Sequence, residues 1–229
     1  MLRDILSGNA STDYVIQVLL LIPIILLSIS VHECAHGYAA YKMGDHTAHD
    51  LGRLTLNPLK HLDPVGFLLL LFFRFGYAKP VPVNTRYMKN AKWGFVAVSL
   101  AGPLSNILMA FVFALLSNIS LVIATYIDFS TPVMMLVTFF SLGVSLNVGY
   151  AVFNLIPIPP LDGSRLLTAC LPRKLALWSF RYERYFQLGL LFLLYLGAFT
   201  GILSVCVSAV SHFIYSTVGL IPFELLCKM

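Results

Sequence analysis

Long apolar runs separated by short polar segments dominate this chain of 229 residues. The first run covers about residues 13–42, the second about 93–117 and the third about 133–155, and apolar character returns from about 185 to 226. Each of the first three runs is long enough for a helix to cross the ~30 Å hydrocarbon layer of a bilayer. The pattern therefore predicts an all-α polytopic membrane protein with about four to six transmembrane helices.

Three parts of the chain fit this pattern less simply. The stretch Phe67–Phe73 is apolar but too short to span, so we expect it to be re-entrant or buried. The stretch Tyr77–Asn84 has prolines at alternate positions, which predicts a short membrane-associated extended segment, at most an edge strand that could pair with an unwound substrate. The last apolar stretch is too long for one helix and marginal for two, which leaves a final crossing open.

Composition agrees with a bilayer as the solvent of this chain. Hydrophobic residues make up 59% of it and charged residues only 11%, whereas a soluble domain carries about a quarter charged residues. Nothing resembles a polar linker, so residues 1–229 are predicted to form a single membrane-embedded domain. The four cysteines are scattered, which indicates neither a disulfide framework nor a thiolate zinc site.

The net charge of +5 reports membrane topology. Lysine and arginine fall almost wholly in two segments, Lys42–Lys92 and Arg165–Arg184, and none lies between Trp93 and Ser164. Clustering of this kind is typical of cytoplasmic segments of multi-pass proteins in the cell membrane. The basic charge therefore gives no reason to expect a nucleic-acid partner.

The sequence "SISVHECAHGYAAY" near the end of the first apolar run carries the candidate chemistry. His32 and His36 are four residues apart, so on a helix they share one face and can bind one metal ion. Glu33 is adjacent and can reach a metal-activated water, which is the logic of the H-E-x-x-H motif. Two histidines with only local hydrogen bonds are the plain alternative, but ionisable groups at membrane depth favour a function.

A catalytic zinc site needs a third protein ligand and an open position for water. Asp45, Asp50 and Asp63 lie in the loop after the first helix, and Asp128 lies on the opposite side of the membrane. Asp162, in "PIPPLDG", is expected at the same membrane level as the histidines. The residues alone leave open whether Asp162 is a ligand or a solvated turn aspartate.

Three motifs together resemble a known family. "HECAH", "AGPLSN" and "FNLIPIPPLDG" occur in this order on three apolar segments and resemble the site-2 protease family of intramembrane zinc metalloproteases. The resemblance implies a three-helix catalytic core within about residues 13–167, followed by C-terminal helices at about 185–226. The loop "GRLTLNPLKHLDPVG" is similar to that of the short bacterial and archaeal members, and neither a PDZ nor a CBS domain is expected.

The resemblance also implies the roles of particular residues. One zinc ion per chain would be held by His32, His36 and Asp162, Glu33 would act as the general base, and Asn154 would hydrogen-bond the substrate or its developing oxyanion. For His61 a structural role is favoured over a supporting one. Asn106 resembles Asn154 in type, but its motif "AGPLSN" is better explained by close helix packing.

The function that follows is hydrolysis of peptide bonds in or near transmembrane segments of membrane proteins, with the active site near the cytoplasmic side. The expected partners are a transmembrane protein substrate, the lipid bilayer and a regulatory membrane protein, and the sequence leaves the oligomeric state open. Two alternatives remain at this point: a metal-ion transporter and a catalytically inactive membrane scaffold. A transporter would favour paired carboxylates and inverted repeats, which the sequence does not show.

Overall fold

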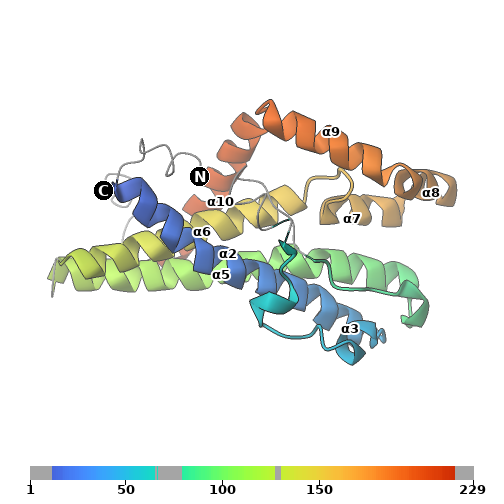
Figure 1. Ribbon diagram of the computed structural model, residues 1–229, viewed down its shortest axis with the longest axis horizontal. Coiled ribbons are helices and arrows are strands. Elements are labelled where there is room, and N and C mark those ends of the chain that lie inside the picture. The colour runs from blue at the N-terminus through green and yellow to red at the C-terminus, as the bar shows by residue number, and fades with distance from the viewer. Residues whose placement is uncertain (1–11, 65, 67–78, 127–129, 220–229) are drawn as a thin grey trace.

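The computed structural model describes residues 12–64, 66, 79–126 and 130–219 (Figure 1). The predictions for Phe67–Phe73, for Asp128 and for the last apolar residues after 219 lie outside the described residues. The prediction that the whole chain forms one domain is not tested and stays a prediction.

Four helices in the described part are long and apolar enough to cross a membrane. They are α2 (Thr12–Lys42), α5 (Ala91–Tyr126), α6 (Thr131–Asn154) and α10 (Thr200–Val218). The most extensive packing is that of α5 against α6, followed by α2 against α5, so α5 lies in the middle of the bundle. The prediction of an all-α polytopic membrane protein is confirmed.

The shorter elements lie in the two connections that the sequence marks as basic. The loop after α2 contains α3 (Thr47–Asp50), η1 (Pro58–Lys60) and η2 (Thr85–Tyr87). The connection from α6 to α10 contains α7 (Asp162–Cys170), α8 (Arg173–Arg181) and α9 (Glu183–Tyr195). In Figure 1, α3, α7 and α8 lie toward the same end of the bundle.

The helix boundaries follow the predicted runs closely, with two differences. Helix α5 has 36 residues, about 54 Å of helix, and ends at Tyr126 instead of near residue 117. The last apolar stretch divides into α9 and α10 at Gly197, whose φ of 72° is a left-handed conformation that favours glycine. Residues 79–84 are extended as predicted, but the described residues contain no β-strand, so this segment has no strand partner there.

The core of the bundle is made of aliphatic and aromatic side chains from α2, α5, α6 and α10 that are fully or almost fully buried. They are Ile24, Ala110, Phe113, Ala114, Val144, Val148, Ile214 and Tyr215. Other large apolar side chains point outward, for example Leu108 at 66% exposure and Ile202 at 69%. A soluble monomer rarely exposes such a surface, whereas lipid can cover it.

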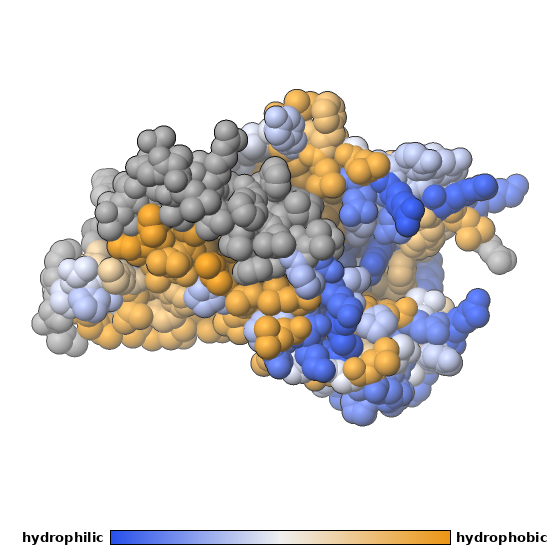
Figure 2. Space-filling view, in the orientation of Figure 1, coloured by the Kyte–Doolittle hydropathy of each residue, from blue (hydrophilic) through white to orange (hydrophobic). Residues whose placement is uncertain are grey.

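Polarity divides the molecule along its long axis. Figure 2 shows hydrophilic residues gathered at the end that holds α3, α7 and α8, and hydrophobic residues over much of the described surface elsewhere. The polar end is also where the basic segments of the sequence come together. This arrangement agrees with a bundle whose one end projects from the bilayer.

Candidate active site

The two histidines of the first motif face each other across one turn of α2. His32 and His36 are buried, with 8% and 6% of their surface exposed. Their Nε2 atoms are 3.0 Å apart, and the rings meet edge to face. The four-residue spacing therefore places two ring nitrogens at one point, as expected.

Asp162 joins this pair from the first turn of α7. Its Oδ2 atom lies 3.3 Å from Nε2 of His32 and 3.2 Å from Nε2 of His36. The ligand atoms of the three residues lie within 4.8 Å of one another. Helix α6 ends at Asn154, and the proline-rich turn that follows cannot continue it, so the chain reverses and begins α7 at Asp162.

A glycine allows α7 to begin so close to the end of α6. A Cβ atom on Gly163 would lie 2.2 Å from the carbonyl oxygen of Leu155. Gly163 is not among the glycines with a positive φ. The sequence therefore needs glycine here for space, and the effect is to bring the Asp162 carboxylate against the histidines.

Hydrogen bonds behind the two rings assign their tautomers. Nδ1 of His36 lies 2.7 Å from the carbonyl oxygen of Val98, which can only accept, so this Nδ1 carries the proton. Nδ1 of His32 lies 2.5 Å from Oδ1 of Asn106. In the neutral form of both rings Nε2 is then unprotonated and presents its lone pair to the other ring and to Asp162.

A chain of buried hydrogen bonds through Asn147 fixes the orientation of the Asn106 side chain. Its Nδ2 donates to Oδ1 of Asn147 at 3.0 Å, and Nδ2 of Asn147 donates to the carbonyl oxygen of Gly143 at 2.8 Å. Both asparagine side chains are fully buried. Because each amide nitrogen is used in this direction, the oxygen of Asn106 must face His32.

Three proton acceptors thus converge at one buried point. Oδ2 of Asp162 is buried and has no hydrogen-bond donor among the described residues. A cation between these atoms would remove the repulsion between their lone pairs.

The donor set fits zinc. Nitrogen and carboxylate oxygen ligands about 2.0–2.1 Å from a tetrahedral zinc ion would be about 3.3 Å apart, close to the three separations found here. Two histidines and one carboxylate also leave a fourth position for water or substrate, as in catalytic zinc sites. His32, His36 and Asp162 are therefore the residues that could hold the ion.

The predicted general base lies beside this centre. Oε2 of Glu33 accepts a hydrogen bond from the backbone N–H of Val81 at 3.0 Å. Glu33 and Asn154 line the same cavity of about 430 Å³ as the three candidate ligands. Nδ2 of Asn154 donates to the carbonyl oxygen of Tyr150 at 3.1 Å, which leaves its second N–H available.

The alternative third ligands lie elsewhere in the described loop. His61 is fully buried with Nε2 2.7 Å from the carbonyl oxygen of Thr55, in keeping with the structural role favoured for it. Asp45 accepts from Thr47 and Asn84, Asp50 pairs with His49, and Asp63 accepts from Gly66. None of these three carboxylates belongs to the cluster around the histidines.

The hydrogen-bonding roles of Asn106 and Asn147 differ from the sequence-based expectation, in which the "AGPLSN" motif serves helix packing and Asn147 has no role. One signal was present: Asn106 follows Gly102 by four residues, so the two share one face of α5. A Cβ atom on Gly102 would lie 2.5 Å from Nε2 of His36, which shows that this face of α5 abuts the histidines.

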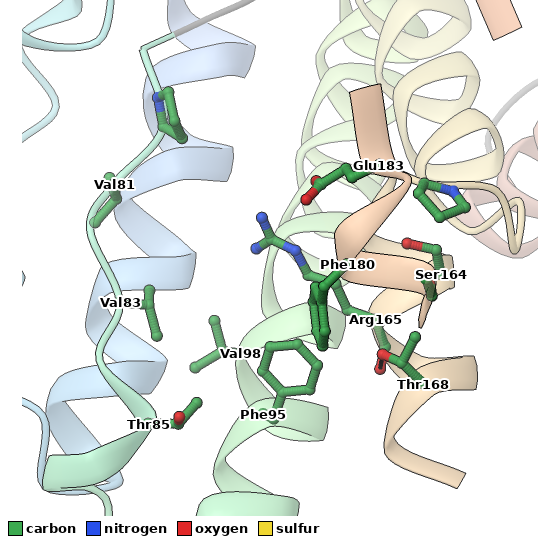
Figure 3. Close-up of a pocket in the computed structure, with 13 residues that line it drawn as sticks. Val81, Val83, Thr85, Phe95, Val98, Ser164, Arg165, Thr168, Phe180 and Glu183 are labelled. Atoms are coloured by element: carbon green, nitrogen blue, oxygen red, sulfur yellow. Dashed lines mark hydrogen bonds between the residues drawn. The ribbon is translucent and has the colours of Figure 1, made fainter. Parts of the chain in front are cut away.

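A second cavity of about 260 Å³ adjoins the first and is shown in Figure 3. The extended segment with Val81 and Val83 forms one side, and Phe95 and Val98 of α5 lie between this segment and α7. Arg165 reaches from α7 toward the extended segment and lines both cavities. The two cavities are therefore neighbours that share part of their walls.

Comparisons with known proteins agree with this geometry. Residues 20–196 match the family model described as Peptidase family M50. A Bacillus subtilis (strain 168) protein named "Putative zinc metalloprotease YwhC" is 46% identical over 150 residues, which are 65% of this chain and 67% of that protein. Rip2 of Mycolicibacterium smegmatis, described in the same words, is 33% identical over 148 residues, 60% of this chain and 52% of the relative.

A more distant relative comes from an archaeon. MJ0611 of Methanocaldococcus jannaschii, again described as a zinc metalloprotease in the same form, is 34% identical over 105 residues, 45% of this chain and 49% of that protein. The chain thus matches about half the length of the mycobacterial and archaeal relatives. No solved structure gives a significant match.

Proposed function

The chain belongs to peptidase family M50 and is a zinc metallopeptidase, and on this premise we propose that it cleaves membrane proteins in or near their transmembrane segments. One observation carries this proposal. Three buried metal-ligand atoms converge at the wall of a 430 Å³ cavity, inside a bundle of apolar helices that are long enough to span a bilayer. A substrate that reaches this cavity laterally would itself be a membrane segment.

In the proposed chemistry His32, His36 and Asp162 hold the zinc ion. When bound, zinc supplies a Lewis acid that polarises a peptide carbonyl and makes water acidic enough to lose a proton near neutral pH. When both rings are neutral, the hydrogen bonds of their Nδ1 atoms to Val98 and Asn106 leave both Nε2 atoms unprotonated, which is the form that binds the ion.

Glu33 moves the proton in this proposal. One of its carboxylate oxygens, Oε1, takes a proton from the attacking water as the C–O bond forms, and Glu33 then gives that proton to the leaving amine as the C–N bond breaks. The second N–H of Asn154 donates to the substrate carbonyl as negative charge develops on its oxygen. Both side chains line the cavity that would hold the substrate.

We place the site near the cytoplasmic side. His32 lies ten residues before the end of α2 at Lys42, about 15 Å along the helix. The following loop and the α7–α9 region carry the basic clusters that are typical of the cytoplasm. Water would enter from that side through the polar end of the molecule. A substrate helix would need to unwind locally, because its carbonyls are otherwise hydrogen-bonded.

The test uses the purified full chain in detergent with a fluorescent single-span membrane protein as substrate. Wild-type protein loaded with zinc should cleave it, 1,10-phenanthroline should stop cleavage, and added zinc should restore it. Glu33→Gln should retain about one zinc per chain and show no cleavage. A Glu33→Gln variant that lost its zinc would make Glu33 a ligand. A loaded wild-type chain that cleaved no membrane substrate but moved zinc across proteoliposomes would contradict the proposal.

A further inference from the structure

An extended strap, defined here as residues 79–84, runs alongside α2 and contacts Glu33. At one end the backbone N–H of Lys79 donates to the carbonyl oxygen of His61 at 2.8 Å, and Nη2 of Arg53 donates to the carbonyl oxygen of Lys79 at 2.8 Å. At the other end the N–H of Asn84 donates to Oδ2 of Asp45 at 2.6 Å. The strap is therefore held at both ends by hydrogen bonds to the loop after α2.

Asp45 is well suited to hold the far end. It is fully buried, and its Oδ1 also accepts from the N–H of Thr47 at 3.0 Å. Burial would raise the pKa of Asp45, but the hydrogen bonds from Thr47 and Asn84 hold it below the ordinary value. The carboxylate stays ionised, and its bond to the Asn84 N–H is charge-assisted.

The prolines of the strap single out one backbone donor. Proline has no N–H, so Val81 supplies the only backbone donor among residues 80–82. The residue before a proline is also restricted to extended conformations, which applies to Val81 before Pro82. The N–H of Val81 donates to Oε2 of Glu33 at 3.0 Å.

A glycine on α2 lets the strap approach this closely. Gly37 follows Glu33 by one turn, so both lie on the same side of the helix. A Cβ atom on Gly37 would lie 3.1 Å from Cγ1 of Val81 and 2.7 Å from Cδ2 of Leu54. Figure 3 shows the strap running alongside α2 with Val81 on it. The hydrogen bonds at both ends of the strap, its prolines and Gly37 of α2 therefore all contribute to the close contact between the strap and α2.

We propose that the backbone N–H of Val81 is a positioning donor that holds the Glu33 carboxylate in its working orientation. This inference rests on the proposed function, in which Glu33 is the base. The bond uses Oε2 and leaves Oε1 for the attacking water. An amide N–H does not transfer its proton at neutral pH, so the contact fixes the direction of the carboxylate while leaving it able to accept a proton. The P-V-P pattern of the strap thereby acquires a function in the active site.

The first experiment removes this single N–H. Val81→Pro keeps an extended backbone and deletes the donor. We expect kcat to fall by roughly 10- to 100-fold, the loss typical of a catalytic group displaced by about 1 Å, while KM and zinc content stay within twofold. Leu56→Pro is the control, because Leu56 is an exposed residue of the loop after α2 and its N–H has no hydrogen-bond partner in the described part of the chain. The control should keep kcat within about threefold.

The second experiment separates positioning from general damage to the fold. In Glu33→Asp the shortened carboxylate no longer reaches the strap, so adding Val81→Pro should lower its remaining kcat by less than threefold. An equal loss in both backgrounds would mean that Val81 acts on something other than Glu33. If Val81→Pro itself failed to fold, replacing Val81 by its α-hydroxy acid analogue removes the N–H and keeps the side chain, and full kcat in that ester variant would overturn the proposal. Failure of the proposed function would instead appear as activity in Glu33→Gln.

Discussion

The bond from His32 to Asn106 gives the sharpest test of how this site is organised. Asn106→Leu removes the oxygen that accepts from Nδ1 of His32 and keeps a branched apolar side chain in a fully buried position. The His32 N–H then has no partner, so the tautomer with the proton on Nε2 becomes competitive. That tautomer has no lone pair to offer a metal ion, and zinc binding should weaken.

The size of the effect follows from the geometry. Leaving one buried polar group without a partner costs about 1–3 kcal/mol. Removing a partner that orients a metal-binding histidine typically lowers metal affinity by about 10- to 100-fold, equivalent to roughly 1.4–2.8 kcal/mol. The two estimates agree. We therefore expect Asn106→Leu to lose about 10- to 100-fold in zinc affinity with its helices intact.

Zinc affinity is measured by competition with a chromophoric chelator on detergent-purified protein, without reference to cleavage. Asn118→Leu is the matched control, because Asn118 is also fully buried on α5 and its side chain has no hydrogen-bond partner among the described residues. It lies twelve residues further along, about 18 Å away. The control should bind zinc like the wild type. Zinc affinity of Asn106→Leu within threefold of the wild type would refute the reasoning.

Three further predictions concern the ligands, the oxyanion and the topology. Alanine at any one of the proposed ligands should abolish stoichiometric zinc binding in metal analysis, and full occupancy in one variant would remove that residue from the set His32, His36 and Asp162. Asn154→Ala should keep zinc yet lose about 10²–10³ in turnover, and near-normal turnover would make Asn154 structural. In a chain with its native cysteines replaced by serine, cysteine at Tyr126 should react with an impermeant thiol reagent in intact cells and cysteine at Leu59 only after permeabilisation; the opposite pattern would reverse the proposed orientation.

Much of the fold could be predicted because a bilayer restricts which segments can span it. The boundaries of α2 and α6 agree with the predicted runs to within about two residues, since a spanning helix must be both apolar and long enough. The end of α5 was less predictable. Its residues after 117 remain apolar and helix-compatible, so composition offered no stop signal before Tyr126.

The candidate site, too, could be predicted from the sequence only in part. That His32 and His36 would meet could be predicted, because they are local on one helix at a spacing of four residues. Asp162 needed the family resemblance, since residue type and order alone could not exclude a solvated turn. The partners of the histidines were out of reach, because a contact between His32 and Asn106 spans 74 positions and depends on how α5 rotates against α2.

The direction of Glu33 on α2 explains why its hydrogen-bond partner comes from the strap and not from α5. On a helix with 3.6 residues per turn, Glu33 points about 100° away from His32, so it cannot use the partners that α5 provides for the histidines. The face of α2 next to Glu33 would otherwise be open to the cavity, and a free carboxylate there would sample several rotamers. A backbone donor on a rigid extended segment solves this, because it needs no volume beyond the main chain and its direction is set by the prolines on either side. In the proposed function the H-E-x-x-H motif supplies the reacting groups on α2, and two other elements orient them from two different sides of that helix: α5 for the ligands and the strap for the base.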